Sequence, residues 1–331
     1  MALPIGDVLG IFADNLEKRK RVVPLSSKKA AAWAEGLDIP VGGDTIIYTG
    51  QMYQLVPSIN SMANWMAKFE NSPITRLFSA GRAVNKVLDL SYFMVLGSGR
   101  EQKAYNGQLR NIAHLIRTAG VEFGYLYERD LYSGALLFDE GVDDVFTEQA
   151  HRVYRAFREN GVKRAITVDP HTTNMLRSVY PKIISEYDIE VKSYLELLAE
   201  RDLNFTKQLE IDVVIHDPCV YARYEDIVNE PRHLLKDAGA TIHEPELSGK
   251  LTHCCGGPLE SLFPSKAHAI AAKRIEQLAS CGTQVATMCP ICLANLKRAA
   301  AGMTLEIKDI SEYLVDACSK QIQMKPQEAV A

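Results

Sequence analysis

The sequence lacks the features of a nucleic-acid-binding, membrane-spanning or secreted protein. Its 331 residues carry 37 Lys+Arg against 41 Asp+Glu, and the net charge of −4 argues against a nucleic-acid partner. The richest apolar run, Leu88–Leu96, is interrupted by Asp89 and Ser91 and falls short of the ~20 residues of a membrane-spanning helix. Residues 1–6 show no basic segment followed by an apolar stretch, so no secretory signal is expected. We therefore expect a globular cytoplasmic protein, peripheral to a membrane only through partners.

Cysteine is absent from the first 218 residues. All seven cysteines lie in the remainder of the chain: Cys219, Cys254, Cys255, Cys281, Cys289, Cys292 and Cys318. In a reducing compartment, thiols are more often metal ligands or redox groups than disulfide partners. The odd number also argues against a closed disulfide framework.

The spacing of five of these cysteines predicts a cluster or metal site. Cys289 and Cys292 form a CxxC motif, which brings two thiolates from a single turn to one metal or cluster. Cys254 and Cys255 are adjacent, and because neighbouring side chains point in different directions, they suit two irons of a polynuclear cluster better than one ion. Cys219 follows an expected strand, at the kind of strand end where α/β sheets present ligands.

Each motif taken alone has a simpler interpretation. A single CxxC motif also occurs in thioredoxin-like redox pairs and in zinc half-sites. The vicinal pair is compatible with two small buried side chains. The order of the five cysteines along the chain favours a cluster over these alternatives. Cys281 and Cys318 lie outside the pattern, and we expect both to be core residues.

The combined pattern resembles the cysteine-rich CCG domain found in the B-type subunit of heterodisulfide reductase and in its relatives. The residues that carry the resemblance are Cys219, Cys254-Cys255-Gly256-Gly257-Pro258 with Phe263-Pro264 after it, and Cys289-Pro290-Ile291-Cys292. The resemblance implies one 4Fe-4S cluster per chain, of the non-cubane type. It also implies the ligand set Cys219, Cys254, Cys255, Cys289 and Cys292.

Members of this family usually carry the CCG domain twice, and the first half of the chain contains a cysteine-free copy. Asp44–Tyr53 aligns with Asp212–Tyr221, and Ala165–Thr172 aligns with Val285–Cys292. Between them, residues 132–134 take the place of residues 254–256. The five ligand positions are thus occupied by Gln51, Tyr132, Ser133, Asp169 and Thr172. None of these supplies a thiolate, so we expect no iron-sulfur cluster in the first half.

Two interpretations of the cysteine-free half are open. The favoured one is a scaffold whose site has decayed. The alternative is a polar pocket beside the remaining cluster, lined by Gln51, Tyr53, Tyr132, Asp169, His171 and Thr172.

Alternation of helical periodicity with short apolar runs predicts an α/β fold. We expect two similar CCG-type α/β domains related by an internal repeat, each with a short parallel sheet flanked by helices. The expected boundaries are 1–43 for an N-terminal extension, 44–205 for the cysteine-free domain and 206–331 for the cysteine-rich domain. The expected strands are Thr45–Tyr48, Val121–Tyr125, Ala165–Val168, Val213–Ile215 and Val285–Met288. The expected helices are Ser58–Phe69, Gly107–Ala119, Thr147–Glu159, Thr173–Val179, Glu225–Ala238, Lys266–Leu278 (with Ser265 as N-cap) and Ala294–Ala299.

The resemblance implies a redox function within a complex. The leading hypothesis is an oxidoreductase subunit of heterodisulfide reductase type, active only in a multi-subunit complex. Its cluster would convert a thiol, disulfide or sulfur-carrier substrate, with sulfur oxidation as one setting. One alternative is a pure electron-transfer or anchoring subunit of a membrane-associated dehydrogenase, with no substrate of its own. Another is a structural zinc subunit, because four thiolates suffice for tetrahedral zinc.

Electrons are expected to pass through another polypeptide, because the chain has no CxxCxxCxxxC motif. The resemblance implies a ferredoxin-type iron-sulfur subunit and a flavin subunit as partners, and a sulfur-containing substrate or carrier protein. Two segments are candidates for contact with a partner. One is the basic run Lys18–Arg21, which is more simply a solvated face, and the other is the insertion Phe78–Gly107.

Overall fold

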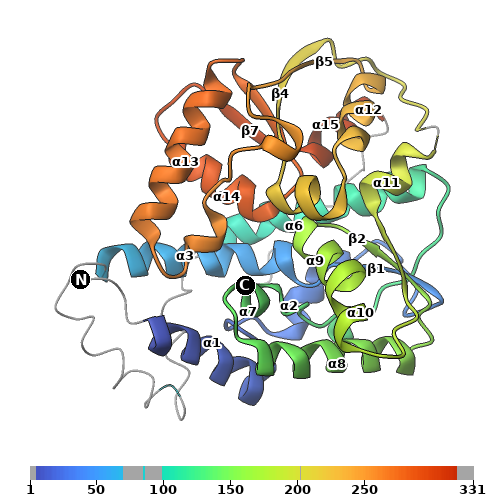
Figure 1. Cartoon of the computed structure of the whole chain (residues 1–331). Helices are drawn as coiled ribbons and strands as arrows, with labels where there is room; N and C mark the ends of the chain where they lie inside the picture. Colours follow the sequence, from blue (N-terminus) through green and yellow to red (C-terminus); the bar gives the residue numbers. More distant parts are fainter. Residues whose placement is uncertain (1–4, 70–84, 86–98, 202, 319–331) are drawn as a thin grey trace, which may run out of the picture.

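Two small parallel sheets form the centres of two similar halves of the molecule (Figure 1). The structure is a computed structural model and describes residues 5–69, 85, 99–201 and 203–318. The first sheet has the order β1-β2-β3, and the second has the order β5-β4-β6-β7. The strands are β1 (Thr45–Tyr48), β2 (Arg164–Thr167), β3 (Glu190–Ser193), β4 (Ile211–His216), β5 (Ala240–His243), β6 (Gln284–Thr287) and β7 (Glu306–Asp309). All pairings are parallel, which confirms the predicted fold class.

Helices connect the strands and cover both sheets. In the first half they are α1 (Ile5–Arg19), α2 (Ser27–Ala31), α3 (Met52–Phe69), α6 (Gly99–Thr118), α7 (Ala135–Asp139), α8 (Asp143–Glu159), α9 (Pro170–Asn174), α10 (Tyr180–Ile183) and α11 (Tyr194–Ala199). In the second half they are α12 (Asn229–Asp237), α13 (Pro264–Ala279), α14 (Pro290–Ala299) and α15 (Ile310–Ala317). Two π-helical turns, η4 (Met175–Val179) and η5 (Tyr221–Glu225), occupy corresponding places near the boundary between the halves. Among the described residues, no helix combines the length and apolar character needed to cross a bilayer.

The central strands are buried on both faces, as their continuous apolar runs predict for parallel sheets. Ile46 and Ile47 of β1 and Val213, Val214 and Ile215 of β4 are almost completely shielded from solvent. The buried cluster around the second sheet continues through α6 into the first half, so the two halves share a core. In Figure 1, α3 and α6 run across the middle of the molecule between the two sheets.

The prediction of a strand at Val121–Tyr125 is wrong, because this segment does not form a regular strand. The segment forms only isolated bridges, between Ile46 and Gly124 and between Val41 and Tyr125. It still lies beside β1, where β5 lies beside β4 in the second half. Its backbone passes so close to residue 42 that a Cβ at position 124 would lie 1.6 Å from the Gly42 carbonyl oxygen.

Most expected helices differ from the observed ones in their bounds, and two differ in a further respect. The N-cap of α13 is Phe263 and not Ser265, because Pro264 takes the first helical position, where its fixed φ fits and its missing N–H costs nothing. The expected helix Glu225–Ala238 is interrupted, because Asp226 adopts a left-handed backbone (φ +59°) between η5 and α12.

Polar contacts between the halves come in matching pairs. Tyr53, two residues after the first ligand position, donates its hydroxyl to Asp309 Oδ2 at 2.8 Å. Tyr221, its counterpart two residues after Cys219, hydrogen-bonds Ser193 Oγ at 2.8 Å. Ser193 and Asp309 are themselves counterparts, because each caps the helix that follows its strand in a capping box. The interface is therefore reciprocal, as expected for an internal repeat.

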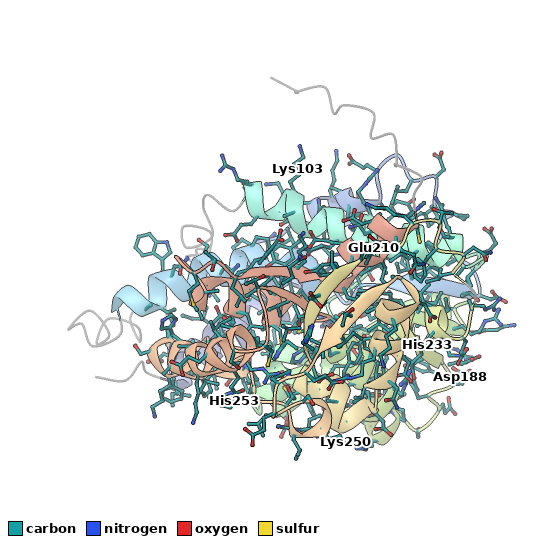
Figure 2. All side chains as sticks on the ribbon, turned by 90° about the horizontal axis from the view of Figure 1, so that it is seen from above. Lys103, Asp188, Glu210, His233, Lys250 and His253 are labelled. Atoms are coloured by element: carbon teal, nitrogen blue, oxygen red, sulfur yellow. The ribbon has the colours of Figure 1, made fainter. Side chains whose placement is uncertain are left out.

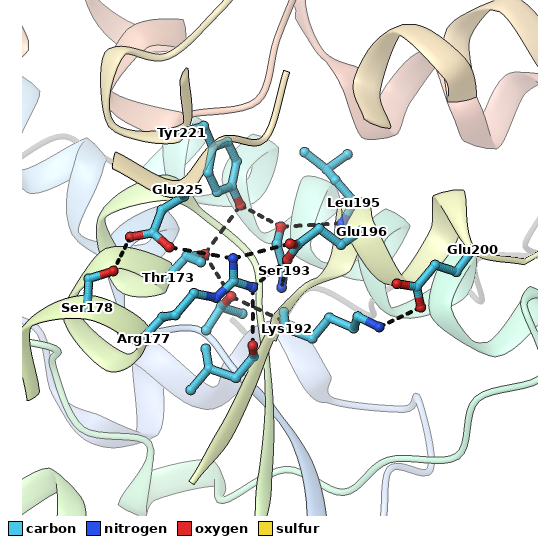
Figure 3. A network of polar contacts seen from close by, with 12 residues as sticks. Thr173, Arg177, Ser178, Lys192, Ser193, Leu195, Glu196, Glu200, Tyr221 and Glu225 are labelled. Atoms are coloured by element: carbon cyan, nitrogen blue, oxygen red, sulfur yellow. Dashed lines mark hydrogen bonds and ion pairs between the residues drawn. The ribbon is translucent and has the colours of Figure 1, made fainter. Parts of the chain in front are cut away.

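Figure 3 shows one side of this interface. Arg177 of the first half lies between Glu196 of its own half and Glu225 of the second. Glu225 is buried and also accepts hydrogen bonds from Asn174 and Ser178. This network fixes η5, which immediately follows Cys219, against α9 and η4.

Several expectations concern segments that the structure describes in part or not at all. Arg19, in the basic run, donates to Asn15 Oδ1 and to the Asn85 carbonyl oxygen, so part of this run packs within the protein. Of the expected insertion Phe78–Gly107, residue 85 and residues 99–107 are described and the rest lies outside the described residues. The domain boundaries remain a prediction.

Candidate iron-sulfur site

Three of the five patterned cysteines, Cys219, Cys289 and Cys292, follow the carboxyl ends of β4 and β6, which are paired neighbours in the second sheet. Cys219 begins the helical turn after β4, and Cys289 is the N-cap of α14 after β6, with Cys292 in the first turn of that helix. Cys254 and Cys255 lie in the loop between β5 and α13. Parallel strands end at the same sheet edge, so this topology brings the three segments together.

The five thiols form a continuous series of hydrogen bonds. The series runs from Cys219 to Cys254, then to Cys255, Cys292 and finally Cys289. Cys255, Cys289 and Cys292 are buried, whereas Cys219 and Cys254 are half-buried. All five residues predicted from spacing therefore meet in one place. Cys318 is buried in the core, as expected. Cys281, also expected in the core, is only half-buried at its edge, where it contacts the Gln277 carbonyl oxygen.

Two glycines make room for this arrangement. Gly256 has a left-handed backbone (φ +82°), and a Cβ there would lie 2.4 Å from the Ala267 carbonyl oxygen. A Cβ at Gly257 would lie 2.5 Å from Ile291 Cγ2 and 3.4 Å from the Cys255 sulfur. The close packing of the loop therefore favours glycine at positions 256 and 257, directly after the two cysteines.

The hydrogen bonds favour thiolates at two of the five positions. Hydrogen bonds from the Cys219 and Cys255 thiols, together with the Gly256 amide at 3.3 Å, lower the pKa of Cys254. Burial opposes ionisation of Cys289, but hydrogen bonds with Cys292 and His171 outweigh it and lower the pKa of this thiol. Clustered thiols with thiolate character are the donor set that iron and zinc require, so the residues fit a thiolate-bound group.

One side chain of the site comes from the cysteine-free half. The His171 imidazole contacts Cys289, and its Nδ1 lies 3.1 Å from Asp139 Oδ2. Burial lowers the pKa of His171, but Asp139 and Cys289 outweigh this effect and raise the pKa well above its usual value. His171 belongs to the pocket residues that the sequence suggested, whereas Asp139 was missed, because nothing in the sequence places it near a cysteine.

The remaining candidate pocket residues mostly serve internal structure. Gln51 Nε2 donates to the Asp130 carbonyl oxygen, and the Asp169 carboxylate caps α9 by accepting from the Thr172 amide. A Cβ at Gly50 would lie 2.4 Å from Thr172 Oγ1, so the space that corresponds to the cysteine site is filled by the chain itself. These contacts support a scaffold interpretation for this part of the first half.

Two further residues beside the thiols were missed by the sequence analysis. His216, the last residue of β4, is fully buried, and one of its ring nitrogens lies within 4.8 Å of the Cys255 and Cys292 sulfurs. Arg274 of α13 donates from Nε to His216 Nδ1 at 3.0 Å. Burial, and then the Arg274 charge, lower the pKa of His216 to about 3. The two residues are 58 positions apart in the sequence, so no local motif could reveal the pair.

A narrow cavity of about 50 Å³ lies next to the thiol site. Its walls are mainly apolar side chains of α1 and α3, including Phe12, Leu55 and Met62. At one end it meets His171 and Ile291, neighbours of the cysteines. On another side the site approaches the molecular surface, since His253, adjacent to Cys254, lies at the periphery in Figure 2.

Comparison with known proteins agrees with this geometry. The cysteine-rich domain family CCG matches residues 213–297, which include all five clustered cysteines. The EtfAB:quinone oxidoreductase of Syntrophomonas wolfei is 30% identical over 222 residues, which are 61% of this chain and 31% of that protein. The probable iron-sulfur-binding oxidoreductase FadF of Bacillus subtilis is 31% identical over 194 residues (56% and 27%).

A third relative is the D-type subunit of the dihydromethanophenazine:CoB–CoM heterodisulfide reductase of Methanosarcina barkeri. It is 25% identical over 243 residues, which are 69% of this chain and 59% of that protein. The matched part of the chain spans less than two thirds of each of these relatives. The chain is a cysteine-rich CCG domain protein related to the D-type subunit of heterodisulfide reductase and to FadF-type iron-sulfur oxidoreductases.

Proposed function

We propose that this chain is the iron-sulfur subunit of an oxidoreductase complex of heterodisulfide reductase type. In this proposal Cys219, Cys254, Cys255, Cys289 and Cys292 hold a single non-cubane 4Fe-4S cluster. The observation that carries it is the gathering of five hydrogen-bonded thiols at one sheet edge. When bound there, such a cluster supplies one-electron transfer. A ferredoxin-type subunit and a flavin subunit are the proposed electron partners.

We further propose that the reacting group is the sulfur of a thiol, disulfide or sulfur-carrier substrate. Three features of the chain support this proposal. The half-buried Cys219 and Cys254 leave part of the site accessible, and a mainly apolar cavity reaches its neighbours His171 and Ile291. Asp139 orients the His171 ring from Nδ1, so that the imidazole presents a polar group at the end of that cavity.

Iron and sulfide analysis of anaerobically purified protein tests the cluster assignment. We expect about four irons and four sulfides per chain, the content of one 4Fe-4S cluster. Cys255→Ser should lose the cluster or convert it to another type, because a buried thiolate ligand is removed. The matched control is Cys281→Ser, at a half-buried cysteine outside the series, which should keep the iron content. About one zinc without sulfide would overturn the proposal in favour of a structural zinc subunit.

An electron relay without a substrate of its own is the second candidate, and the size of the cavity favours it. Pockets for small molecules usually measure ~300–1,000 Å³, whereas the cavity here is about 50 Å³. Electron paramagnetic resonance of the oxidised cluster separates the two candidates. A spectrum that changes when a small alkyl thiol is added supports sulfur chemistry. An unchanged spectrum, together with rapid reoxidation by a protein acceptor, supports the relay.

A further inference from the structure

His216 lies at the end of β4 with none of its surface exposed. One of its ring nitrogens is within 4.8 Å of the sulfurs of Cys255 and Cys292. Its Nε2 is also buried and has no hydrogen-bond partner among the described residues. A buried polar nitrogen without a partner is costly to stability, so it points to an acceptor that the occupied site would supply.

Arg274 decides which ring nitrogen carries the proton. The Nε–H of an arginine can only donate, and it lies 3.0 Å from His216 Nδ1, which must therefore accept through its lone pair. In a neutral imidazole the proton then sits on Nε2. Arg274 is itself fully buried and is held in place by the Leu247 carbonyl oxygen at 2.8 Å and by Gln277 Oε1 at 3.0 Å. The tautomer is thus fixed by packing that lies away from the cysteines.

We infer that His216 is a positioning residue of the five-thiol site, a neutral Nε2–H donor toward its sulfur atoms and not a metal ligand. A nitrogen that carries a proton has no lone pair for a metal, which separates His216 from the histidine ligands of zinc and copper sites. This inference rests on the proposed function, because it takes the occupant of the site to be an iron-sulfur cluster.

The expected consequence is a higher midpoint potential of the cluster. Hydrogen bonds to the sulfurs of a cluster stabilise its more negative, reduced state, and are among the factors that set its potential. A hydrogen bond to a charged group is worth roughly a tenfold change in an equilibrium constant. For a one-electron couple, tenfold corresponds to ~59 mV.

Redox titration of His216 variants, followed by electron paramagnetic resonance, tests the inference in the complete chain. His216→Leu should keep the wild-type iron content. Its midpoint potential should be lower by ~59 mV, which corresponds to a tenfold change in the equilibrium constant of the one-electron couple. His216→Gln, whose side chain keeps an N–H near the position of Nε2, should restore most of the shift. The matched control is His243→Leu, at an exposed histidine of the neighbouring strand β5, which should leave the potential unchanged.

Two outcomes of the titration overturn the inference. Loss of iron from a His216→Leu protein with a wild-type circular dichroism spectrum would make His216 a ligand. Full iron content with an unchanged potential would make it a packing residue only. If His216→Leu does not fold, the comparison of His216→Gln with wild type decides the ligand question, because glutamine is a poor replacement for a histidine ligand but retains the donor.

A second measurement separates the failure of this inference from the failure of the proposed function. Nitrogen-15 NMR of the histidines in the cluster-free chain reports the tautomer of His216 whether or not a cluster is ever bound. A proton on Nε2 upholds the locked tautomer, and a proton on Nδ1 overturns it. Wild-type protein without iron and sulfide would instead refute the proposed function, and with it the role of His216 toward a cluster.

Discussion

The two halves of this molecule keep the same backbone at corresponding points but differ in chemistry. Gly134 and Gly256 follow the third ligand position with nearly the same left-handed φ, +83° and +82°. Asp169 and Cys289 each lie just after a central strand, as the N-cap of a helix whose first residue is a proline. The loop and helix geometry that presents ligands is thus retained in the half that has none, because the same geometry builds the core and the interface.

The space at the two sites differs as much as the side chains do. In the first half Gly50 lies against Thr172, and the residues at the positions that correspond to the cysteines make buried hydrogen bonds. The space that corresponds to the cysteine site is therefore filled. The exception is His171, which lies between the corresponding positions 169 and 172 and contacts Cys289 of the other half. The first half thus contributes a side chain to the surroundings of the cysteine site.

The largest expected effect comes from exchanging the residues at one pair of corresponding positions. Cys289→Asp should abolish iron binding, because it replaces a thiolate of the buried series with a carboxylate. The helix should survive, because an aspartate already caps α9 at the corresponding position by accepting from the Thr172 amide. Iron analysis together with circular dichroism measures both effects.

The reverse exchange at all five corresponding positions, with cysteine in place of Gln51, Tyr132, Ser133, Asp169 and Thr172, is the matched control. It should add no iron, since the surrounding space is filled by the chain itself around Gly50. A second iron-sulfur centre in this variant would show that the first half is a usable site that lacks only its ligands. It would contradict the interpretation that this space is filled.

The sequence predicts which cysteines come together, and the two similar halves, better than it predicts the edges of the elements. β1 has the predicted bounds, because its apolar run is uninterrupted. β3, β5 and β7 were missed. β3 and β7 mix apolar with charged residues, as in Glu190-Val191-Lys192-Ser193, and β5 is a short strand in which two of four residues are exposed. The start of α3 was placed six residues late, after Pro57, but the helix contains this proline in its interior.

The parts of the site that escaped prediction are those made by contacts between distant segments. His216 and Arg274 meet across 58 positions, and Asp139 belongs to the site only through its contact with His171. Spacing motifs report ligands that share a turn, as Cys289 and Cys292 do. They carry no information about which helix will pack beside that turn. Residues that support a site in this way can therefore be identified only from the folded structure.

A smaller effect is expected at the two matched glycines. Gly256→Ala should lower the free energy of unfolding by about 3 kcal/mol, because the left-handed backbone is strained and the new Cβ meets the Ala267 carbonyl oxygen at 2.4 Å. Gly134→Ala should cost about 2 kcal/mol, since its Cβ would meet the Phe146 ring at 2.9 Å, and a side chain yields more easily than backbone. Anaerobic urea unfolding of both variants gives the comparison. Equal costs would show that backbone strain alone matters.

The smallest expected effects concern the two reciprocal tyrosines, and they differ in pH dependence. Burial raises the pKa of Asp309 to about 6 from 3.8, against the hydrogen bonds from Ser311 and Tyr53. The folded protein therefore binds this proton more tightly than the unfolded chain, and stability falls as pH rises through this interval. Tyr53→Phe removes one donor to the carboxylate and raises the pKa further. Its cost should be about 2 kcal/mol near pH 8, where Asp309 is ionised, and about 1 kcal/mol near pH 5.

Tyr221→Phe provides the matched variant, because its partner Ser193 does not titrate in this range. We expect a cost of about 1 kcal/mol at both pH values, that of a neutral hydrogen bond. Urea unfolding of the two variants at both pH values measures the difference. If Tyr53→Phe has the same cost at both pH values, Asp309 is not the group that Tyr53 stabilises. The two sides of the interface would then be alike in energy as well as in geometry.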